Sequence, residues 1–472
     1  LSVATLAIMN VTAVVSLRGL AAESVYGLGS AFYYLFAAMV FLIPTALVAA
    51  ELAAMFSDKQ GGVFRWIGEA FGARMGFLAI WLQWIQSTIW YPTVLTFGAV
   101  SIAFIGMNQQ ADMALASNKL FTLVVVLAIY WTATFISLKG LDWVGKISKW
   151  GGIIGTIIPA GLLIVLGVIY LVTGGHNNMD MSAGFFPDLK KFDNLVLASS
   201  IFLFYAGMEM MGIHVMDVNN PKRNYPKAII IGSLITVAIF ILGTFSLGFI
   251  IPAKEVSLTQ SLLIGFDRYF DYLHMSWASP LIAIALMFGV LAGVLTWVAG
   301  PSKGIFTVGK AGYLPPFFQK SNKNGVQRNI LLVQGGIVTL LSLLFVVMPS
   351  VQSFYQILSQ MTTSLYLIMY MMLFASAIVL RYRMRDSDRP FRLGGNFTMW
   401  IIAGLGFCGS LLAFILSFIP PAQISTGDPK TWVTILIVGC IIVVVVPFVI
   451  YAMRKPSWKS SGAEFAPFHW EK

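Results

Sequence analysis

Long apolar runs separated by short polar segments make up almost the whole chain. A run of about 20 apolar residues is long enough to cross a bilayer as a helix. Twelve runs meet this criterion, at residues 3–24, 29–55, 75–106, 118–138, 150–173, 195–217, 227–251, 276–300, 329–349, 354–380, 399–419 and 431–453. The pattern therefore predicts an all-α polytopic membrane protein with twelve transmembrane helices.

The polar connections between these runs are short. The longest, at 174–194 and 301–328, are predicted to be loops, and residues 454–472 form a short polar tail. No connection is large enough for a separate soluble domain.

Composition supports a membrane protein, and the positions of the charges predict its orientation. Hydrophobic residues make up 58% of the chain and charged residues only 10%, whereas soluble domains carry about 25% charged residues. Of the 30 Lys and Arg residues, 23 lie in one alternating set of connections and six in the other. Loops rich in Lys and Arg face the cytoplasm, so both termini are predicted to be cytoplasmic. The net charge of +11 thus reflects membrane topology and does not indicate nucleic-acid binding.

Other classes of protein lack support in the sequence. Four histidines and two cysteines are scattered without metal-ligand spacing. No nucleophile–base pair that would indicate an enzyme is evident, and no repeated filter segment suggests a channel. We expect no cofactor and no metal.

Four charged residues stand out inside the predicted spans: Arg18, Glu23, Glu51 and Glu209. A charge at the centre of a membrane helix costs roughly 2.5–3.5 kcal/mol even on insertion scales, so such residues usually face the bundle interior or a water-filled path. Glu51, near the cytoplasmic end of its span, is interpreted as structural.

The first and sixth spans combine charge with glycine. The first contains Arg18 and Gly19 in SLRGLAAES (16–24), and the sixth contains Gly207 and Glu209. Transporters built from inverted repeats place discontinuous helices at corresponding positions of their two halves, and substrate binds there. We predict a break at Arg18–Gly19 and another at Gly207, facing a shared polar cavity.

For two residues, Arg18 and His214, the sequence is compatible with two interpretations. Arg18 either binds a substrate carboxylate or forms an internal ion pair with Glu23 or Glu209. His214, on the cytoplasmic half of the sixth span, is either a pH sensor or an ordinary hydrogen-bonded side chain.

Several segments resemble hallmark regions of the amino acid–polyamine–organocation transporters. These are QGGVFRWIGEAFG (60–72), NPKRNYPKA near 219–228, the segment 300–326 and RDSDRPFRLGG (385–395). Within that superfamily the chain most resembles the bacterial glutamate/GABA antiporters, through FYAGMEMMGIHVMDVNNPKRNYP, GVLAGVLTWVAGPSKG and LYLIMYMMLF.

The resemblance implies a LeuT-like fold of two inverted repeats. They would comprise residues 1–174 and 195–382, followed by two helices in 399–453 and a cytoplasmic tail, 454–472. It also implies exchange of external glutamate or glutamine for internal GABA across the bacterial inner membrane, linked to acid resistance, by a monomer or homodimer. Its partners would be the amino acid, its exchange partner and lipid. Another amino acid or amine pair, or an amino acid sensor, remains an alternative.

The expected substrate site combines residue-based arguments with the resemblance. Half-helix N-termini favour carboxylates and carbonyls favour cations, so the carboxylate is placed near Arg18 and the amine near Glu209. Tyr366 and Tyr370 match paired tyrosines of the family and, four residues apart, share a helix face. The full predicted set is Ser16, Leu17, Arg18, Gly19, Tyr205, Ala206, Gly207, Glu209, Gly293, Trp297, Tyr366 and Tyr370.

Two positions depart from the related acid-resistance antiporter. Gly293 replaces a glutamate and Leu17 a tyrosine of that protein. Trp90, Tyr91 and Pro92 in the third span are interpreted as either packing or path-lining residues.

Overall fold

The computed structural model is built of helices. It describes residues 2–182, 184–186, 195–210, 219–422, 425, 427–463 and 465–471. Within these ranges ten helical segments are long and apolar enough to cross a membrane. They are α3–α4 (Gly29–Ala37, Ile43–Met55), α6 (Ala73–Ala103), α8 (Lys119–Leu138), α9–α10 (Leu141–Gly152, Ile158–Val172), α12 (Pro221–Ile250), α14 (Ser279–Val308), α15–α16 (Arg328–Ser342, Leu344–Val347), α17 (Val351–Arg383), α18 (Asn396–Leu416) and α19 (Pro429–Ala452).

These ten segments confirm ten of the predicted spans as apolar helices. The remaining two predicted spans are interrupted. The first consists of α1 (Val3–Val14) and the short helix α2 (Leu20–Ser24), and the sixth contains α11 (Ser200–Tyr205). His214 lies outside the described residues.

The predicted loop 301–328 is wrong over its first part. α14 continues through Pro301 to Val308, and a π-helical turn, Gly309–Tyr313, extends it further. The Ser302 hydroxyl, which follows the proline, donates to the Val298 carbonyl and accepts from Gln327 Nε2 at 2.7 Å. Pro301 has no N–H to donate to the Trp297 carbonyl, but the helix continues through it, so Gly300-Pro301 does not end the helix here.

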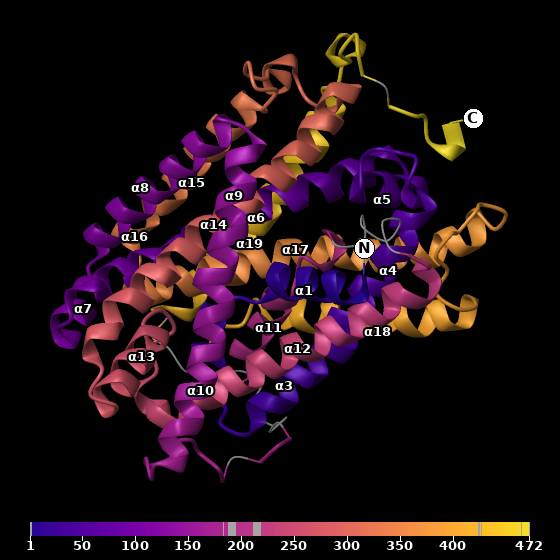
Figure 1. Ribbon diagram of the computed structural model, residues 1–472. Coiled ribbons are helices and arrows are strands. Elements are labelled where there is room, and N and C mark those ends of the chain that lie inside the picture. Colours follow the sequence, from indigo (N-terminus) through magenta and orange to yellow (C-terminus); the bar gives the residue numbers. More distant parts are fainter. Residues whose placement is uncertain are drawn as a thin grey trace.

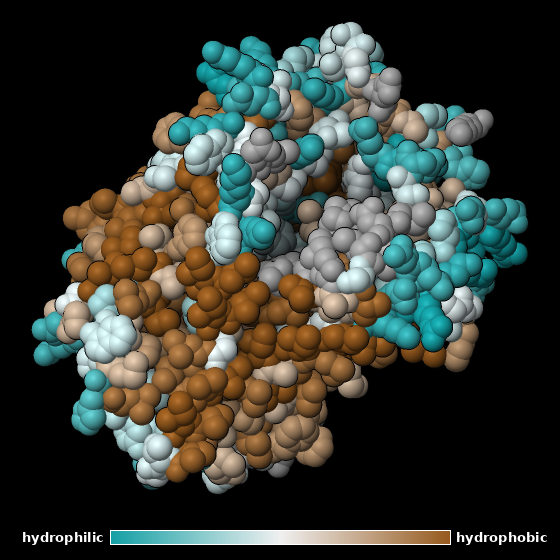
Figure 2. All heavy atoms as spheres, viewed as in Figure 1, coloured by the Kyte–Doolittle hydropathy of each residue, from teal (hydrophilic) through white to brown (hydrophobic). Residues whose placement is uncertain are grey.

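The helices form a bundle with a central and a peripheral part (Figure 1). α6 packs against α14 and α17, and α1 packs against α12. In α6 the most apolar window is 78% buried, whereas in α19 it is only 17% buried, which places α6 at the centre and α19 at the edge. Figure 2 shows hydrophobic residues over the broad middle of the visible face and hydrophilic ones gathered where α5 (Val63–Phe71) and the C-terminus lie.

Three shorter helices lie between the spans: α5, α7 (Gln109–Ala116) and α13 (Ser261–Tyr272). The polar tail packs onto α5. Phe468 is buried against Phe64 and Gly68, and Arg65 donates to the carbonyls of Ala466 and Pro467. Gly68 is required there, because a Cβ would lie 2.5 Å from the Phe468 ring.

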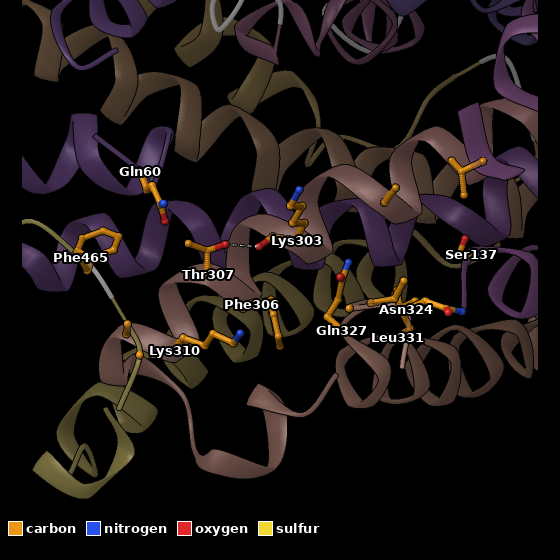
Figure 3. Close-up of a pocket in the computed structure, with 16 residues that line it drawn as sticks. Gln60, Ser137, Lys303, Phe306, Thr307, Lys310, Asn324, Gln327, Leu331 and Phe465 are labelled. Carbon is orange, nitrogen blue, oxygen red and sulfur yellow. Dashed lines mark hydrogen bonds between the residues drawn. The ribbon is translucent and has the colours of Figure 1, made fainter. Parts of the chain in front are cut away.

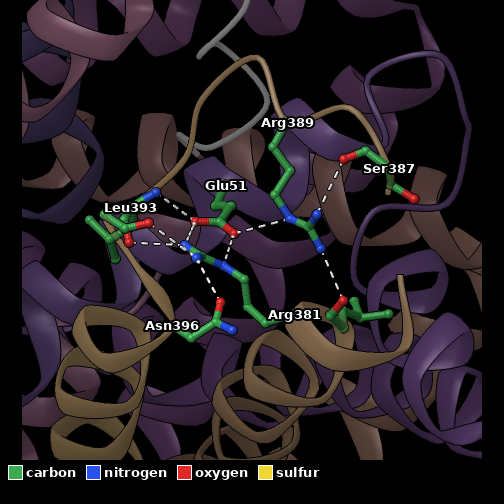
Figure 4. A network of polar contacts seen from close by, with 8 residues as sticks. Glu51, Arg381, Ser387, Arg389, Leu393 and Asn396 are labelled. Atoms are coloured by element: carbon green, nitrogen blue, oxygen red, sulfur yellow. Dashed lines mark hydrogen bonds and ion pairs between the residues drawn. The ribbon is translucent and has the colours of Figure 1, made fainter. Parts of the chain in front are cut away.

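Glu51, interpreted as structural, is the centre of a buried ion-pair network (Figure 4). Arg381 from α17 binds both carboxylate oxygens at 2.6 Å, and the Leu393 backbone N–H donates to one of them at 2.7 Å. Arg389 Nε adds a contact at 3.4 Å. Because two cations and an amide surround it, the Glu51 charge is fully compensated, and it ties α4 to α17 and the following loop.

Removing Arg381 should therefore destabilise the fold. Arg381→Met leaves Glu51 with only Arg389 and one backbone donor, and breaking a buried pair costs roughly 3–5 kcal/mol. Arg392→Met, at an exposed arginine of the same loop, should change stability by less than about 0.5 kcal/mol. Chemical unfolding of both variants in detergent measures the difference. Equal stability of the two would show that the network contributes little.

Candidate functional site

A cavity of about 630 Å³ lies where the interrupted helices meet. Its wall includes Val14–Arg18 at the break of the first helix and Leu203, Phe204 and Ala206 at the break of the sixth. α6, α14 and the α9 region, including Lys149, complete the wall. Such a concave site between broken helices is where carriers of this kind bind small molecules.

The first helix is broken at Val15–Ser16, one turn before the predicted position. Ser16 has an extended backbone (φ −133°, ψ 112°), and a 3₁₀ turn, Leu17–Gly19, follows it. Gly19 itself is helical (φ −78°, ψ −18°), so the prediction that it loosens the backbone is wrong. Its lack of a side chain serves packing instead, because a Cβ at Gly19 would lie 2.4 Å from the Phe204 ring.

The sixth helix breaks at the predicted glycine. Ala206 is extended (φ −70°, ψ 153°) and Gly207 has φ +108°, a conformation that favours glycine. The Gly207 N–H, freed from helical bonding, donates to the Tyr370 hydroxyl at 2.7 Å. The chain can therefore leave the helix at this depth without an unsatisfied donor.

Arg18 lines the cavity, and no acidic residue among those that the structure describes pairs with it. It is 4% exposed, and its Nη1 donates to Thr93 Oγ1 at 2.9 Å. Its guanidinium lies over the rings of Trp90, Phe204 and Tyr355, at 5.2, 5.5 and 5.9 Å from Cζ to each centroid. Nε has no hydrogen-bond partner among the described residues.

Neither predicted internal ion pair of Arg18 forms in this conformation. In the described part of the chain, the partners of Glu23 and Glu209 are polar but uncharged. Rings and one hydroxyl compensate a cation only partly. Within the described part of the chain the charge of Arg18 is thus only partly compensated.

Glu209 is held by three neutral donors. The hydroxyls of Tyr366 and Tyr370 donate to its two oxygens, and Gln83 Nε2 donates to Oε1 at 3.2 Å. The two tyrosine rings stand 4.7 Å apart, centroid to centroid, on one face of α17. This confirms their predicted common face, and together with Gln83 the two hydroxyls bind both oxygens of the Glu209 carboxyl group.

The structure brings seven of the twelve predicted residues to the cavity wall, namely Ser16, Leu17, Arg18, Ala206, Gly293, Trp297 and Tyr366. The other five lie outside this wall. Gly19 packs beneath Phe204, and Tyr205 turns toward Tyr34, where its hydroxyl donates to the backbone carbonyl at 3.3 Å. Gly207, Glu209 and Tyr370 form the hydrogen-bonded layer behind Tyr366.

Sequence reasoning missed part of the wall on α6, apart from Trp90, for which path lining was one of two interpretations. Gln86, Trp90 and Phe97 line the cavity, and Thr93 holds Arg18. The spacing of these four residues places them on one face of a helix. Gln83 and Gln86, two glutamines in a largely apolar span, were the available signal. Of the residues flanking Pro92, Trp90 lines the cavity, whereas Tyr91 is buried against Tyr130.

A second cavity, of about 360 Å³, lies near the C-terminal tail (Figure 3). Its wall includes Lys303, Thr307 and Lys310 of the α14 region, Gln327, and Phe465 of the tail. None of its wall residues belongs to the interrupted helices. We therefore take the first cavity as the candidate substrate site.

The fold and the site define a helical membrane protein of the carrier type, with a cavity at interrupted helices. The family model for amino acid permeases matches residues 1–458, and the chain belongs to this family.

Three relatives show the range of this similarity. An uncharacterized transporter of Legionella pneumophila is 36% identical, covering 95% of this chain and 96% of the relative. A glutamate/gamma-aminobutyrate antiporter of Lactococcus lactis is 33% identical over 90% of this chain and 84% of its own. A probable agmatine/putrescine antiporter of Lactococcus lactis is 26% identical over 83% and 82% of the two chains.

Two glycines next to the cavity should respond differently to alanine. At Gly207 the positive φ costs an L-residue about 1–2 kcal/mol, and the new methyl would lie 3.1 Å from the Trp297 ring. At Gly293 nothing lies within 4 Å of the position that a methyl group would take. Gly207→Ala should therefore lower the unfolding free energy in detergent by at least about 1 kcal/mol. Gly293→Ala should not lower it, because inside a helix such as α14 glycine is less stable than alanine by about 0.5–1 kcal/mol. Equal losses would contradict the assigned geometry.

Proposed function

We propose that the protein is a secondary active amino acid antiporter that works by alternating access. The preferred exchange is external glutamate or glutamine for internal GABA. The observation that carries this proposal is the charge of the cavity. Among its described wall residues the charged ones are Arg18 and Lys149, and both are basic. A cavity of this kind favours a ligand with a carboxylate.

Arg18 is the proposed carboxylate ligand. Its Nε is unpartnered and its guanidinium is planar, so it can offer a carboxylate two parallel hydrogen bonds. Ser16 and Leu17 at the break are proposed to bound the same end of the substrate. All three amino acids in the proposed exchange bear a carboxylate, which lets one residue serve both directions of transport.

The substrate amine is proposed to lie toward Ala206 and Glu209. Ala206 lines the cavity, and Glu209, which we propose to be ionised, stands directly behind Tyr366. Its negative charge favours a cation at that end of the cavity. Tyr366 and Tyr370 are proposed to position Glu209, while Trp297 and Tyr205 shape the path between the two helix breaks. Gly207 and Gly19 permit the close approach of these groups.

The proposed architecture has twelve spans, with the two interrupted helices added to the ten long ones. We propose the LeuT-like arrangement of two inverted repeats, residues 1–174 and 195–382, followed by the helices of 399–453. Both termini are proposed to be on the cytoplasmic side of the bacterial inner membrane, from the distribution of Lys and Arg. Lys149, in the cavity wall, belongs to that cytoplasmic set, so the cavity extends toward the cytoplasm.

Two other classes of substrate for a transporter of this fold are less well supported. Agmatine and putrescine, named for one relative, are cations without a carboxylate, and Arg18 would repel them. A neutral amino acid is favoured by one observation, the open space at Gly293. A neutral amino acid has a carboxylate that Arg18 could bind, but it has no anionic side chain.

Counterflow into proteoliposomes tests the proposal. Vesicles preloaded with GABA should take up labelled glutamate or glutamine, more at acid than at neutral pH, and should exchange putrescine poorly. If only neutral amino acids were exchanged, the proposed substrates, glutamate or glutamine and GABA, would be wrong. No exchange with any amino acid would contradict an antiporter and favour a sensor.

Arg18→Ala should weaken the binding of every substrate that carries a carboxylate. Losing a hydrogen bond to a charged group costs about 1.5–3 kcal/mol, so apparent Kd should rise roughly 10- to 150-fold. Arg18→Lys should recover only part of this affinity, since it restores the charge without the planar fork. Thr93→Val, which removes only the hydroxyl that orients Arg18, is the matched control with a smaller effect. Unchanged glutamate and GABA affinities in Arg18→Ala would remove Arg18 from the site.

A further inference from the structure

Glu23 is a second buried carboxyl group, and the proposed substrate site does not use it. It lies on α2, one turn beyond Arg18, and is 0% exposed. Its Oε1 is 2.9 Å from Ser200 Oγ of α11. Its Oε2 has no hydrogen-bond partner among the described residues. The contact thus joins the two interrupted helices.

The other hydrogen bond of Ser200 indicates whether Ser200 or Glu23 donates the proton in this contact. Ser200 Oγ is also 2.6 Å from the carbonyl oxygen of Leu197. A carbonyl oxygen only accepts, and a serine hydroxyl has a single proton to donate. If that proton points to Leu197, then the contact at 2.9 Å is a hydrogen bond only when Glu23 carries a proton and donates it to Ser200 Oγ.

The two distances favour this assignment. A hydroxyl that donates to an ionised carboxylate usually lies about 2.5–2.7 Å from it. Here the shorter distance is the one to the neutral carbonyl, and the longer is the one to Glu23. Glu209 provides the contrast, because three donors point at it. The two buried carboxyls therefore have opposite surroundings, and Glu23 has those of a neutral acid.

No basic side chain in the described ranges compensates a charge on Glu23. Tyr34 of α3 and Tyr205 of α11 are the titratable groups that interact with it electrostatically. Their hydroxyls are used elsewhere: Tyr34 pairs with Thr244 at 2.9 Å, and Tyr205 donates to the Tyr34 carbonyl.

The other helices packed against α2 bring no counter-ion either, within the part of the chain that the structure describes. α12 approaches α2 at Gly243, which contacts Leu20, and the basic residues of α12 are about four turns away. On α13, Arg268 is paired with Glu255 at 2.7 Å, and Asp271 accepts from Ser276 at 2.6 Å. Asp267 interacts with Ser279, Asp271 and Asp112 rather than with Glu23.

We propose that Glu23 is a proton-binding site that couples proton movement to the transport cycle. While α2 and α11 are in contact, the carboxyl is protonated and donates to Ser200. When the two segments separate and water enters, the carboxyl O–H bond breaks. The proton passes to water and the electron pair stays on the carboxylate, which becomes hydrated. The protonation itself is independent of the proposed function, whereas the coupling rests on it.

The protonation is tested without any substrate, by infrared difference spectroscopy of the purified protein between acid and alkaline pH. The carbonyl band of a protonated, desolvated carboxyl should persist at neutral pH and disappear in Glu23→Gln. It should remain in the matched control Glu255→Gln, because Glu255 is exposed and ion-paired. In the unmodified protein, a carbodiimide should label Glu23, as located by mass spectrometry. An unchanged band in Glu23→Gln, or no labelling of Glu23, would overturn the proposal.

The coupling is tested in proteoliposomes that contain a trapped pH dye. A glutamine side chain can donate to Ser200 as the acid does, so Glu23→Gln should fold and retain counterflow of any substrate found with the amino acid panel. It should lose the proton flux that accompanies transport, and Glu255→Gln should keep it. Full proton flux in Glu23→Gln, or none in the unmodified protein, would contradict coupling through Glu23. A protein that exchanges no amino acid would refute the proposed function and the coupling together, while the infrared result still decides the protonation.

Discussion

A charge in a dry protein interior is costly unless neighbouring groups compensate it. The degree of compensation distinguishes the buried charged residues that hold the fold together from those at the candidate site. Glu51 is matched by two arginines and a backbone amide. Glu209 is matched by three neutral donors. Arg18 has only one hydroxyl and the faces of three rings among the described residues, and it borders a cavity. We propose that a ligand completes this interaction, and the proposed carboxylate specificity follows from the incomplete compensation of Arg18.

The interruptions of the first and sixth helices are what allow this charge to reach the cavity. A continuous helix would satisfy its own backbone and present only side chains. At Ser16 and Ala206 the chain is extended instead, so wall residues of both helices converge on one space. Glycines make the approach possible: Gly19 admits the Phe204 ring, and Gly155 lies against Gly289 where α14 meets the turn between α9 and α10.

The sequence predicted much of the fold, because membrane spans depend on the length and hydropathy of a run and little else. It also indicated Arg18, Glu209 and the tyrosine pair, since charges and spaced aromatics stand out in apolar helices. It did not locate the first break at Val15–Ser16, because neither residue is a helix breaker. The extension of α14 past Pro301 was missed for the converse reason. A proline by itself indicates a helix end, yet α14 continues through Pro301 to Val308.

Partners from distant parts of the chain were the least predictable. Thr93 holds Arg18 across 75 residues, and Ser200 meets Glu23 across 177. Nothing in the local pattern of either segment encodes these contacts; they depend on how α2, α6 and α11 pack.

The most direct test of the central claim is a structure of the protein with glutamate bound in lipid nanodiscs. The proposed site predicts a ligand carboxylate within hydrogen-bonding distance of the Arg18 guanidinium, inside the cavity between the two helix breaks. A ligand bound elsewhere, for example beside Lys303 and Lys310, with Arg18 still contacting only Thr93 and the aromatic rings, would contradict it.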